Sequence, residues 1–166
     1  MVFTPRSFSE GKKVKKSLVL IAVLLLTLAC SGKKEERTLA PYFSLKDLSG
    51  KKITMDQFKG KPFLLVFWAT WCPTCRSEIP FLNELAQEGH TVVAIALDRD
   101  REKLAQFAKE HRIKYTILMG SYQVTIDYGN VRFLPTIFLV DAQGYIVGRM
   151  VGGLDKKKVE AFLKRG

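Results

Sequence analysis

Two cysteines three positions apart are the residues of this chain best suited to chemistry. Cys72 and Cys75 stand in the stretch FWATWCPTCRSEIP, after a continuous apolar run and at the start of a helical pattern. Free backbone N–H groups at a helix N-terminus stabilise a thiolate, which lowers its pKa from the usual value of about 8.5. The spacing therefore predicts that Cys72 is a nucleophile and that Cys75, one turn later, can attack a mixed disulfide formed at Cys72.

Two alternatives to a redox couple are a zinc site and a pair of buried, inert cysteines. A structural zinc site needs four ligands, and the chain adds only His90 and His111, without a second CxxC or an HxxxH motif. Inert cysteines fit poorly beside a Pro-Thr dipeptide and a tryptophan. These considerations favour a redox couple and predict no metal site.

The elements that must position the couple alternate between strands and helices. The run KPFLLVFWAT before the cysteines is apolar, β-branched and aromatic, which is typical of a strand buried on both faces of a sheet. A helical pattern follows the first cysteine, and the order then repeats. The expected elements are strand 61–70, helix 73–88, strand 91–98, helix 101–111, strand 115–118 and a weak helix 121–128.

Each end of the globular part suggests a hairpin. Residues 43–55 alternate around a Ser49-Gly50 turn signal, and residues 136–152 give two strands joined by a turn at 141–144. A last helix is capped by Asp155. Strands that alternate with helices and close with an antiparallel hairpin predict an α/β fold with a mixed sheet between helices.

The N-terminus has the pattern of an export signal. A basic stretch at 12–16 precedes an apolar run at 18–29, which is shorter than the roughly 20 residues that cross a bilayer. The run ends in LTLAC, which resembles the lipobox of bacterial lipoproteins, although Thr27 stands where that motif favours leucine. We expect a signal peptide at 1–29 and lipid on Cys30 within a linker at 30–38; an uncleaved anchor and simple secretion are the alternatives.

Charge and cysteine count narrow the function further. The formal net charge of +11 is spread thinly, with no arginine-rich stripe and no interleaved aromatics, so we expect no nucleic-acid partner. With Cys30 assigned to lipid, the other two of the three cysteines leave no structural disulfide framework. The chain of 166 residues fits one domain, which we expect to be a monomer.

The stretch FWATWCPTCRSEIP resembles the thioredoxin superfamily. It is most similar to the exported, membrane-tethered oxidoreductases of the TlpA, ResA and CcmG type, which carry an AhpC/TSA- or redoxin-like domain. The resemblance extends from Leu39 to Arg165. It implies a thioredoxin-like, three-layer α/β/α fold over residues 39–166, with a central mixed sheet, an N-terminal β-hairpin and an inserted αβ element at 98–120.

The resemblance also implies roles for individual residues. Cys72 and Cys75 would be the redox pair, and Pro80 would kink the active-site helix. Thr74 would either tune the reduction potential through local hydrogen bonding or serve as a solvent-facing spacer. Pro135 matches the cis-proline that faces the disulfide. The residues implied to contact substrate are Trp71, Pro73, Thr74, Leu134 and Pro135.

One position departs from the pattern of general thioredoxins. Those proteins carry a buried Asp six residues before the first cysteine, where this chain has Val66. Glu78, three residues after Cys75, instead matches the acidic residue that ResA-like proteins place near the active site. A buried carboxyl has a raised pKa and can exchange protons with the resolving thiol, so Glu78 is the third expected catalytic residue. The alternative is an exposed Glu78 favoured by the helix dipole.

The implied function is that of an extracytoplasmic thiol-disulfide oxidoreductase anchored in the cell envelope. Its substrates would be disulfides of exported proteins, apocytochrome c among them, and its electrons would come from a membrane donor of the CcdA or DsbD type. It would need no cofactor beyond the Cys72–Cys75 disulfide. The alternatives are a peroxidase, whose sequence pattern before the cysteine is missing, and a non-catalytic lipoprotein module.

Four aromatic and basic residues near the couple complete the set of candidates. Phe67 and Trp68 end the apolar strand and are expected in the core. Tyr128 and Arg132 precede the segment with Pro135, and either one is a candidate for the border of a substrate groove.

Overall fold

The computed structural model describes residues 37–165 of the chain. The expected signal peptide, Cys30 and most of the expected linker lie outside the described residues. Within the described part, no helix combines the length and the apolar character needed to cross a bilayer.

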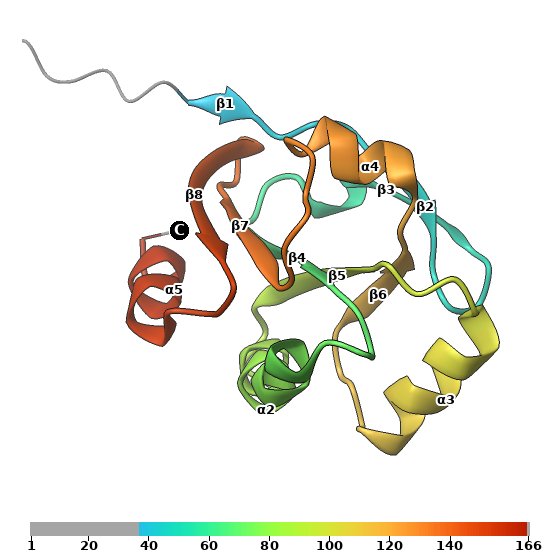
Figure 1. The fold of residues 1–166 in the computed structure, drawn as a ribbon. Helices are drawn as coiled ribbons and strands as arrows, with labels where there is room; N and C mark the ends of the chain where they lie inside the picture. The colour runs from blue at the N-terminus through green and yellow to red at the C-terminus, as the bar shows by residue number, and fades with distance from the viewer. Residues whose placement is uncertain (1–36, 166) are drawn as a thin grey trace, which may run out of the picture. The chain divides into compact units, whose positions relative to one another are not determined.

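A six-stranded mixed sheet forms the centre of the fold (Figure 1). Its strand order is β1-β8-β7-β4-β5-β6. Strands β4, β5 and β6 run parallel, whereas β7 runs antiparallel to β4, and β8 and β1 continue the antiparallel half. The strands are β1 (Thr38–Leu39), β4 (Phe63–Trp68), β5 (Thr91–Ala96), β6 (Thr116–Met119), β7 (Thr136–Val140) and β8 (Tyr145–Val151).

A separate hairpin precedes the sheet along the chain. It consists of β2 (Ser44–Lys46) and β3 (Lys52–Thr54), and a short 3-10 helix η1 (Met55–Phe58) follows it. The Asp47 carboxylate closes the turn by accepting hydrogen bonds from the backbone N–H groups of Ser49 and Lys51, both at 2.9 Å. A single bridge from Asp47 to Leu118 of β6 ties the hairpin to the edge of the sheet.

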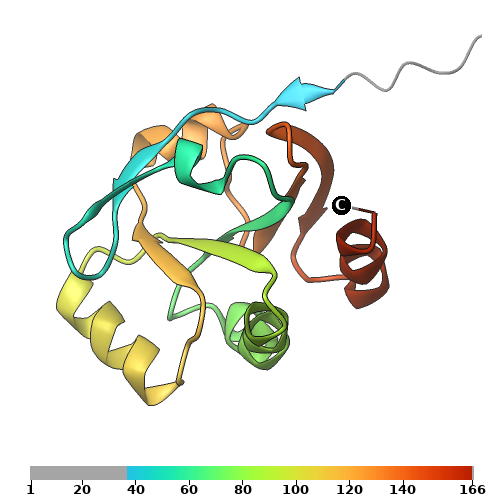
Figure 2. The ribbon, with the colours of Figure 1, turned by 180° about the vertical axis from the view of Figure 1, so that it is seen from behind.

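Helices cover both faces of the sheet, which gives three layers. Helices α2 (Pro73–Gln87), α3 (Arg101–Glu110) and α5 (Lys156–Leu163) pack on one face. The other face carries α4 (Tyr122–Asp127) together with the hairpin and η1, as the view from behind also shows (Figure 2).

Strand β4 connects the two halves of the core, because its side chains alternate between the two faces. Leu64, Val66 and Trp68 pack under α2, with Ile79, Leu82 and Leu85 of that helix. Phe63, Leu65 and Phe67 point to the opposite cluster, which contains side chains of the hairpin and α4. Every residue of β4 is buried, since β5 and β7 flank the strand and both faces are covered.

The observed fold confirms the expected three-layer α/β/α architecture with its N-terminal hairpin. The expected insertion at 98–120 contains α3 and β6. The sequence did not predict η1 or β1, and β1 includes Thr38, which was expected in the linker. A strand of two residues is too short to show alternation, so only its pairing with Tyr145 and Ile146 of β8 reveals it.

Candidate active site

The two cysteines meet at the N-terminus of α2. Helix α2 starts at Pro73, which suits a first helical position because it has no N–H to leave unpaired. Cys72 is the N-cap residue, and the backbone N–H of Cys75 donates to its sulfur at 3.2 Å. A disulfide joins the two residues, whose Cα atoms lie 5.3 Å apart. In the reduced protein the same N–H would stabilise a Cys72 thiolate.

Both sulfurs are shielded, while their neighbours are open to solvent. Cys72 and Cys75 are 5% and 3% exposed. Trp71 is 67% exposed, and Pro73 and Thr74 are exposed as well. Among the hydrogen bonds of residues 37–165, none involves the Thr74 side chain, which supports its role as a solvent-facing spacer.

The loop before the couple is held by a carboxylate that the sequence analysis did not single out. Asp98 accepts from the backbone N–H of Thr70 at 3.1 Å and from the Thr70 hydroxyl at 2.6 Å. The N–H of Leu97 also donates to the carbonyl of Trp68 at 2.9 Å. These bonds fix the chain just before Trp71. The sequence could have indicated this contact, because Asp98 follows β5, and the parallel strands β4 and β5 end at the same edge of the sheet.

Glu78 lies on α2, three residues after Cys75, and is half-buried. Its Oε2 atom is fully buried and has no hydrogen-bond partner within the described chain. This burial raises the pKa of Glu78 from its usual 4.5 to about 7, and the backbone N–H of Leu154 opposes the shift. The alternative of an exposed Glu78 is therefore wrong.

Tyr115 lies within electrostatic reach of Glu78. Burial of the Tyr115 hydroxyl, and secondarily the charge of Glu78, raise the pKa of Tyr115 above its usual value. Tyr115 therefore stays a neutral phenol at physiological pH. Of the two residues, Glu78 is the one that changes its charge near neutral pH.

The segment before β7 extends toward the two cysteines. Thr136 pairs with Phe67 of β4, so the residues before Thr136 continue past the end of β4 toward the cysteines. The Leu134–Pro135 peptide bond is cis, as the resemblance implies. The Pro135 carbonyl accepts from the N–H of Gly152 at 2.8 Å. Within residues 37–165 no backbone hydrogen bond involves Leu134, so its N–H and C=O stay available for another polypeptide.

The remaining candidate residues lie either in the core or on the surface. Phe67 and Trp68 are core residues, as expected. Tyr128 is also buried, and its hydroxyl donates to the carbonyl of Pro41 at 2.8 Å, which excludes it from a groove. Arg132 is exposed. The sequence analysis overlooked Phe133, which is 69% exposed directly before Leu134.

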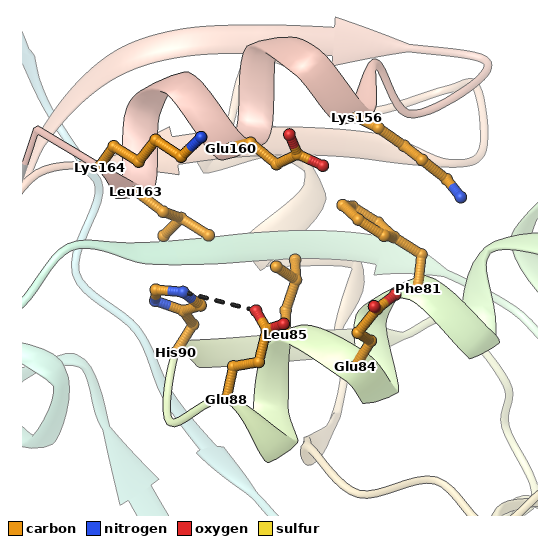
Figure 3. A pocket seen from close by; sticks show the side chains of 9 residues that line it. All are labelled: Phe81, Glu84, Leu85, Glu88, His90, Lys156, Glu160, Leu163 and Lys164. Atoms are coloured by element: carbon orange, nitrogen blue, oxygen red, sulfur yellow. Dashed lines mark ion pairs between the residues drawn. The ribbon is translucent and has the colours of Figure 1, made fainter.

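A hollow lies toward the C-terminal end of α2, away from the cysteines (Figure 3). Side chains of α2 and α5 line it, among them Glu84 and Glu88 facing Lys156 and Lys164. His90 lies 3.9 Å from a Glu88 carboxylate oxygen. Neither here nor elsewhere in residues 37–165 do three His, Cys, Asp or Glu side chains gather in a way that would hold a metal ion.

Comparison with known proteins agrees with this geometry. The family model described as Redoxin matches residues 34–163. The chain belongs to the redoxin family. Within it, the chain is similar to the thiol-disulfide oxidoreductase ResA of Bacillus cereus, with 31% identity over 92% of this chain and 98% of that protein. This redoxin is therefore a thiol-disulfide oxidoreductase of the ResA type with Cys72 and Cys75 as its CxxC pair.

Solved structures show the same fold. The redoxin domain superimposes on a thiol:disulfide interchange protein of the thioredoxin family from Chlorobium tepidum with a TM-score of 0.70 and 31% identity, covering 80% of this chain and 97% of that one. It also matches the pneumococcal exposed lipoprotein thioredoxin Etrx1 from Streptococcus pneumoniae, with a TM-score of 0.67 and 26% identity over 76% of this chain and 100% of that one.

Proposed function

We propose that this redoxin reduces disulfides of exported polypeptides, with Cys72 as the attacking and Cys75 as the resolving residue. The observation that carries the proposal is the position of Cys72. It caps α2 where a backbone N–H reaches its sulfur, and the unpaired backbone of Leu134 lies on the adjacent segment. A polypeptide that pairs with Leu134 would therefore present its disulfide to the one sulfur that the helix N-terminus activates.

The proposed reaction transfers two electrons from the dithiol to the substrate. The Cys72 thiolate attacks one substrate sulfur, a Cys72–substrate bond forms, and the substrate S–S bond breaks with release of the first substrate thiol. The Cys75 thiolate then attacks the Cys72 sulfur and releases the second substrate thiol. The protein ends with the Cys72–Cys75 disulfide, and the two protons of the dithiol end on the substrate thiols.

Glu78 is proposed to accept the proton of Cys75 in the second step. Cys75 must lose its proton to attack, and a group with a pKa of about 7 exchanges protons efficiently near neutral pH. The unpartnered Oε2 atom of Glu78 supports this role, because no described donor competes for it. Proton transfer through Glu78 would favour the resolving step over escape of the mixed disulfide.

The proposed location is outside the cytoplasm, with lipid on Cys30 as the anchor. The basic and apolar stretch before Cys30 supports this location, and so does the likeness to an exposed lipoprotein thioredoxin. A membrane donor of the CcdA or DsbD type would return electrons to the couple, and apocytochrome c is one proposed substrate. Mass spectrometry of the membrane-fraction protein tests the anchor, and an unmodified N-terminus at another residue would refute it.

The central experiment replaces each cysteine in turn. Cys72→Ser should abolish reduction of insulin disulfides, since the attacking sulfur is lost. Cys75→Ser should accumulate a mixed disulfide, because nothing resolves it; non-reducing electrophoresis detects the adduct. Full activity of the Cys72→Ser protein would contradict the proposed mechanism.

The direction of electron flow is tested by the reduction potential of the couple. A reductase should equilibrate with glutathione or dithiothreitol buffers near the thioredoxin value of about −270 mV. A value near about −120 mV, typical of strong oxidants on this fold, would reverse the proposed direction.

A further inference from the structure

A basic groove lies at the end of the parallel strands. It has a volume of about 650 Å³ and opens beyond the carboxyl ends of β5 and β6, where ligands of parallel sheets commonly bind. We call it the basic groove and define it by Asp98, Arg99, Gly120, Tyr122 and Arg132 among its lining residues.

Gly120 forms the floor of the basic groove, where β6 lies close to β5. The N–H of Gly120 donates to the carbonyl of Ala96 at 2.8 Å, which holds the end of β6 against β5. A Cβ atom at position 120 would lie 2.7 Å from the same carbonyl oxygen, closer than atoms can pack. Only glycine fits there, since a side chain at position 120 would push the end of β6 away from β5.

The charge of the groove is positive. Arg99 and Arg132 are exposed, and neither forms an ion pair with a carboxylate in the part of the chain that the structure describes. The one carboxylate in the lining, Asp98, is occupied by Thr70. Nearby Asp100 is also engaged, since it caps α3 by accepting from two backbone N–H groups. No carboxylate of the described residues therefore neutralises either guanidinium group.

Arg132 is held in place before a ligand arrives. With the Asn130 amide oriented so that its oxygen faces the guanidinium, that oxygen accepts from Nε at 2.9 Å and from Nη2 at 2.8 Å. Guanidinium groups bind carboxylates through paired N–H bonds, and an oriented guanidinium loses less entropy when it does so.

Two lining residues connect the basic groove to segments of the redox site. Asp98 holds Thr70, two residues before Cys72, and Arg132 lies two residues before Leu134. A substrate paired with Leu134 and attacked by Cys72 therefore extends past Arg132. We propose that the basic groove binds an Asp or Glu side chain of the substrate polypeptide, close in sequence to the cysteine that Cys72 attacks. This inference rests on the proposed reduction of polypeptide disulfides.

The test compares two disulfide-bonded peptides that differ only by Glu or Gln at the positions flanking the cysteine. At low ionic strength, we expect the reduced, full-length protein to react with the Glu peptide with a second-order rate constant about tenfold larger than with the Gln peptide. The preference should shrink in high salt because the groove is open to solvent. The ratio of the Glu-peptide rate to the Gln-peptide rate should fall to about one in Arg99→Gln/Arg132→Gln. A third peptide, with Lys at the same positions, should react fastest with Arg99→Glu/Arg132→Glu.

A matched control removes two positive charges that line the hollow between α2 and α5 instead of the basic groove. Lys156→Gln/Lys164→Gln alters the hollow of Figure 3 and should keep the Glu preference. Equal rates for the Glu and Gln peptides with the unmodified protein would overturn the inference, as would an equal loss of preference in the lysine control. A small neutral disulfide such as hydroxyethyl disulfide separates the two proposals: if the protein reduces it without discriminating between the peptides, only the groove proposal fails.

Discussion

Two carboxyl groups flank the redox couple, and their surroundings give them opposite properties. Asp98, at the end of β5, accepts hydrogen bonds from the backbone and the hydroxyl of Thr70. Glu78, on α2, has a buried oxygen without a partner among the described residues. The comparison shows that burial alone does not decide what a carboxyl group does near an active site. The hydrogen-bond donors around each carboxyl distinguish the one that holds a loop from the one that we propose exchanges protons.

The physical cause of the difference is the number of hydrogen-bond donors that face each carboxyl group. Hydrogen bonds to a carboxylate are among the strongest in proteins, so Asp98 is well suited to holding a loop. Glu78 loses hydration, and the backbone N–H of Leu154 only partly offsets that loss, so the pKa of Glu78 rises to about 7. Asp98 thus holds the loop before Cys72, whereas Glu78 is the carboxyl that we propose receives the proton of Cys75.

The largest effect is expected from removing the supporting carboxylate. Asp98→Ala leaves the N–H and hydroxyl of Thr70 without their acceptor, which should lower the free energy of unfolding by about 2–3 kcal/mol. Urea denaturation measures the loss. Asp127→Ala is the matched control, because Asp127 is an exposed carboxylate that accepts from the Gln123 side chain. If both variants lose the same small amount, Asp98 is not a support.

An intermediate effect is expected from the half-buried carboxyl of Glu78. The folded-state pKa of Glu78 is about 7, above its usual 4.5, so the folded protein keeps a proton that the unfolded chain releases. This contribution to stability is complete below pH 4.5 and is lost as the pH rises through about 7. Because solvent partly screens the half-buried group, we expect a loss of about 1–2 kcal/mol, which Glu78→Gln should remove.

The measurement is the urea-unfolding free energy of oxidised protein at pH 5 and pH 8.5, for the unmodified chain and for Glu78→Gln. Glu84→Gln, an exposed position on the same helix, should behave like the unmodified chain. The alkylation rate of Cys75 in a Cys72→Ser background gives a second readout, since its pH profile should lose an inflection near 7 when Glu78 is replaced. Unchanged profiles in both experiments would remove Glu78 from the proton pathway.

The smallest effect is expected from trimming the support rather than removing it. Thr70→Val keeps the shape of the side chain and the backbone N–H bond to Asp98, but deletes the hydroxyl bond of 2.6 Å. We expect a loss of about 1 kcal/mol. Adding Asp98→Ala should then cost less than it does in the unmodified chain, since the two residues share one interaction. Strict additivity of the two losses would mean that the bond contributes nothing.

Local pattern and resemblance predicted the parts of the site that depend on spacing along the chain. Cys72, Cys75 and Glu78 lie on one helix, so their relation follows from helical geometry. Leu134 and Pro135 were found through the resemblance, and the cis bond agrees with it. The mixed sheet followed from the alternation of strands and helices.

The parts that sequence reasoning missed depend on contacts between distant segments. Thr70 and Asp98 are 28 residues apart and meet only because β4 and β5 run parallel in register. Tyr128 and Arg132 stand in irregular segments, where no period predicts which side chain turns inward. Tyr128 turned to the core because the carbonyl of Pro41 accepts its hydroxyl.

The inserted element carries a consequence for how this fold can change. Residues 98–120 supply Asp98 and Arg99 on one wall of the basic groove and Gly120 on its floor, whereas the couple belongs to α2 and the end of β4. Asp98 holds Thr70, so it cannot vary without disturbing the loop before Cys72. Arg99 is exposed and forms no ion pair in the described part of the chain, so it can vary without that effect. Two adjacent positions of one inserted element are therefore under different constraints, and a lineage can diversify the proposed substrate preference at Arg99 while Asp98 is retained.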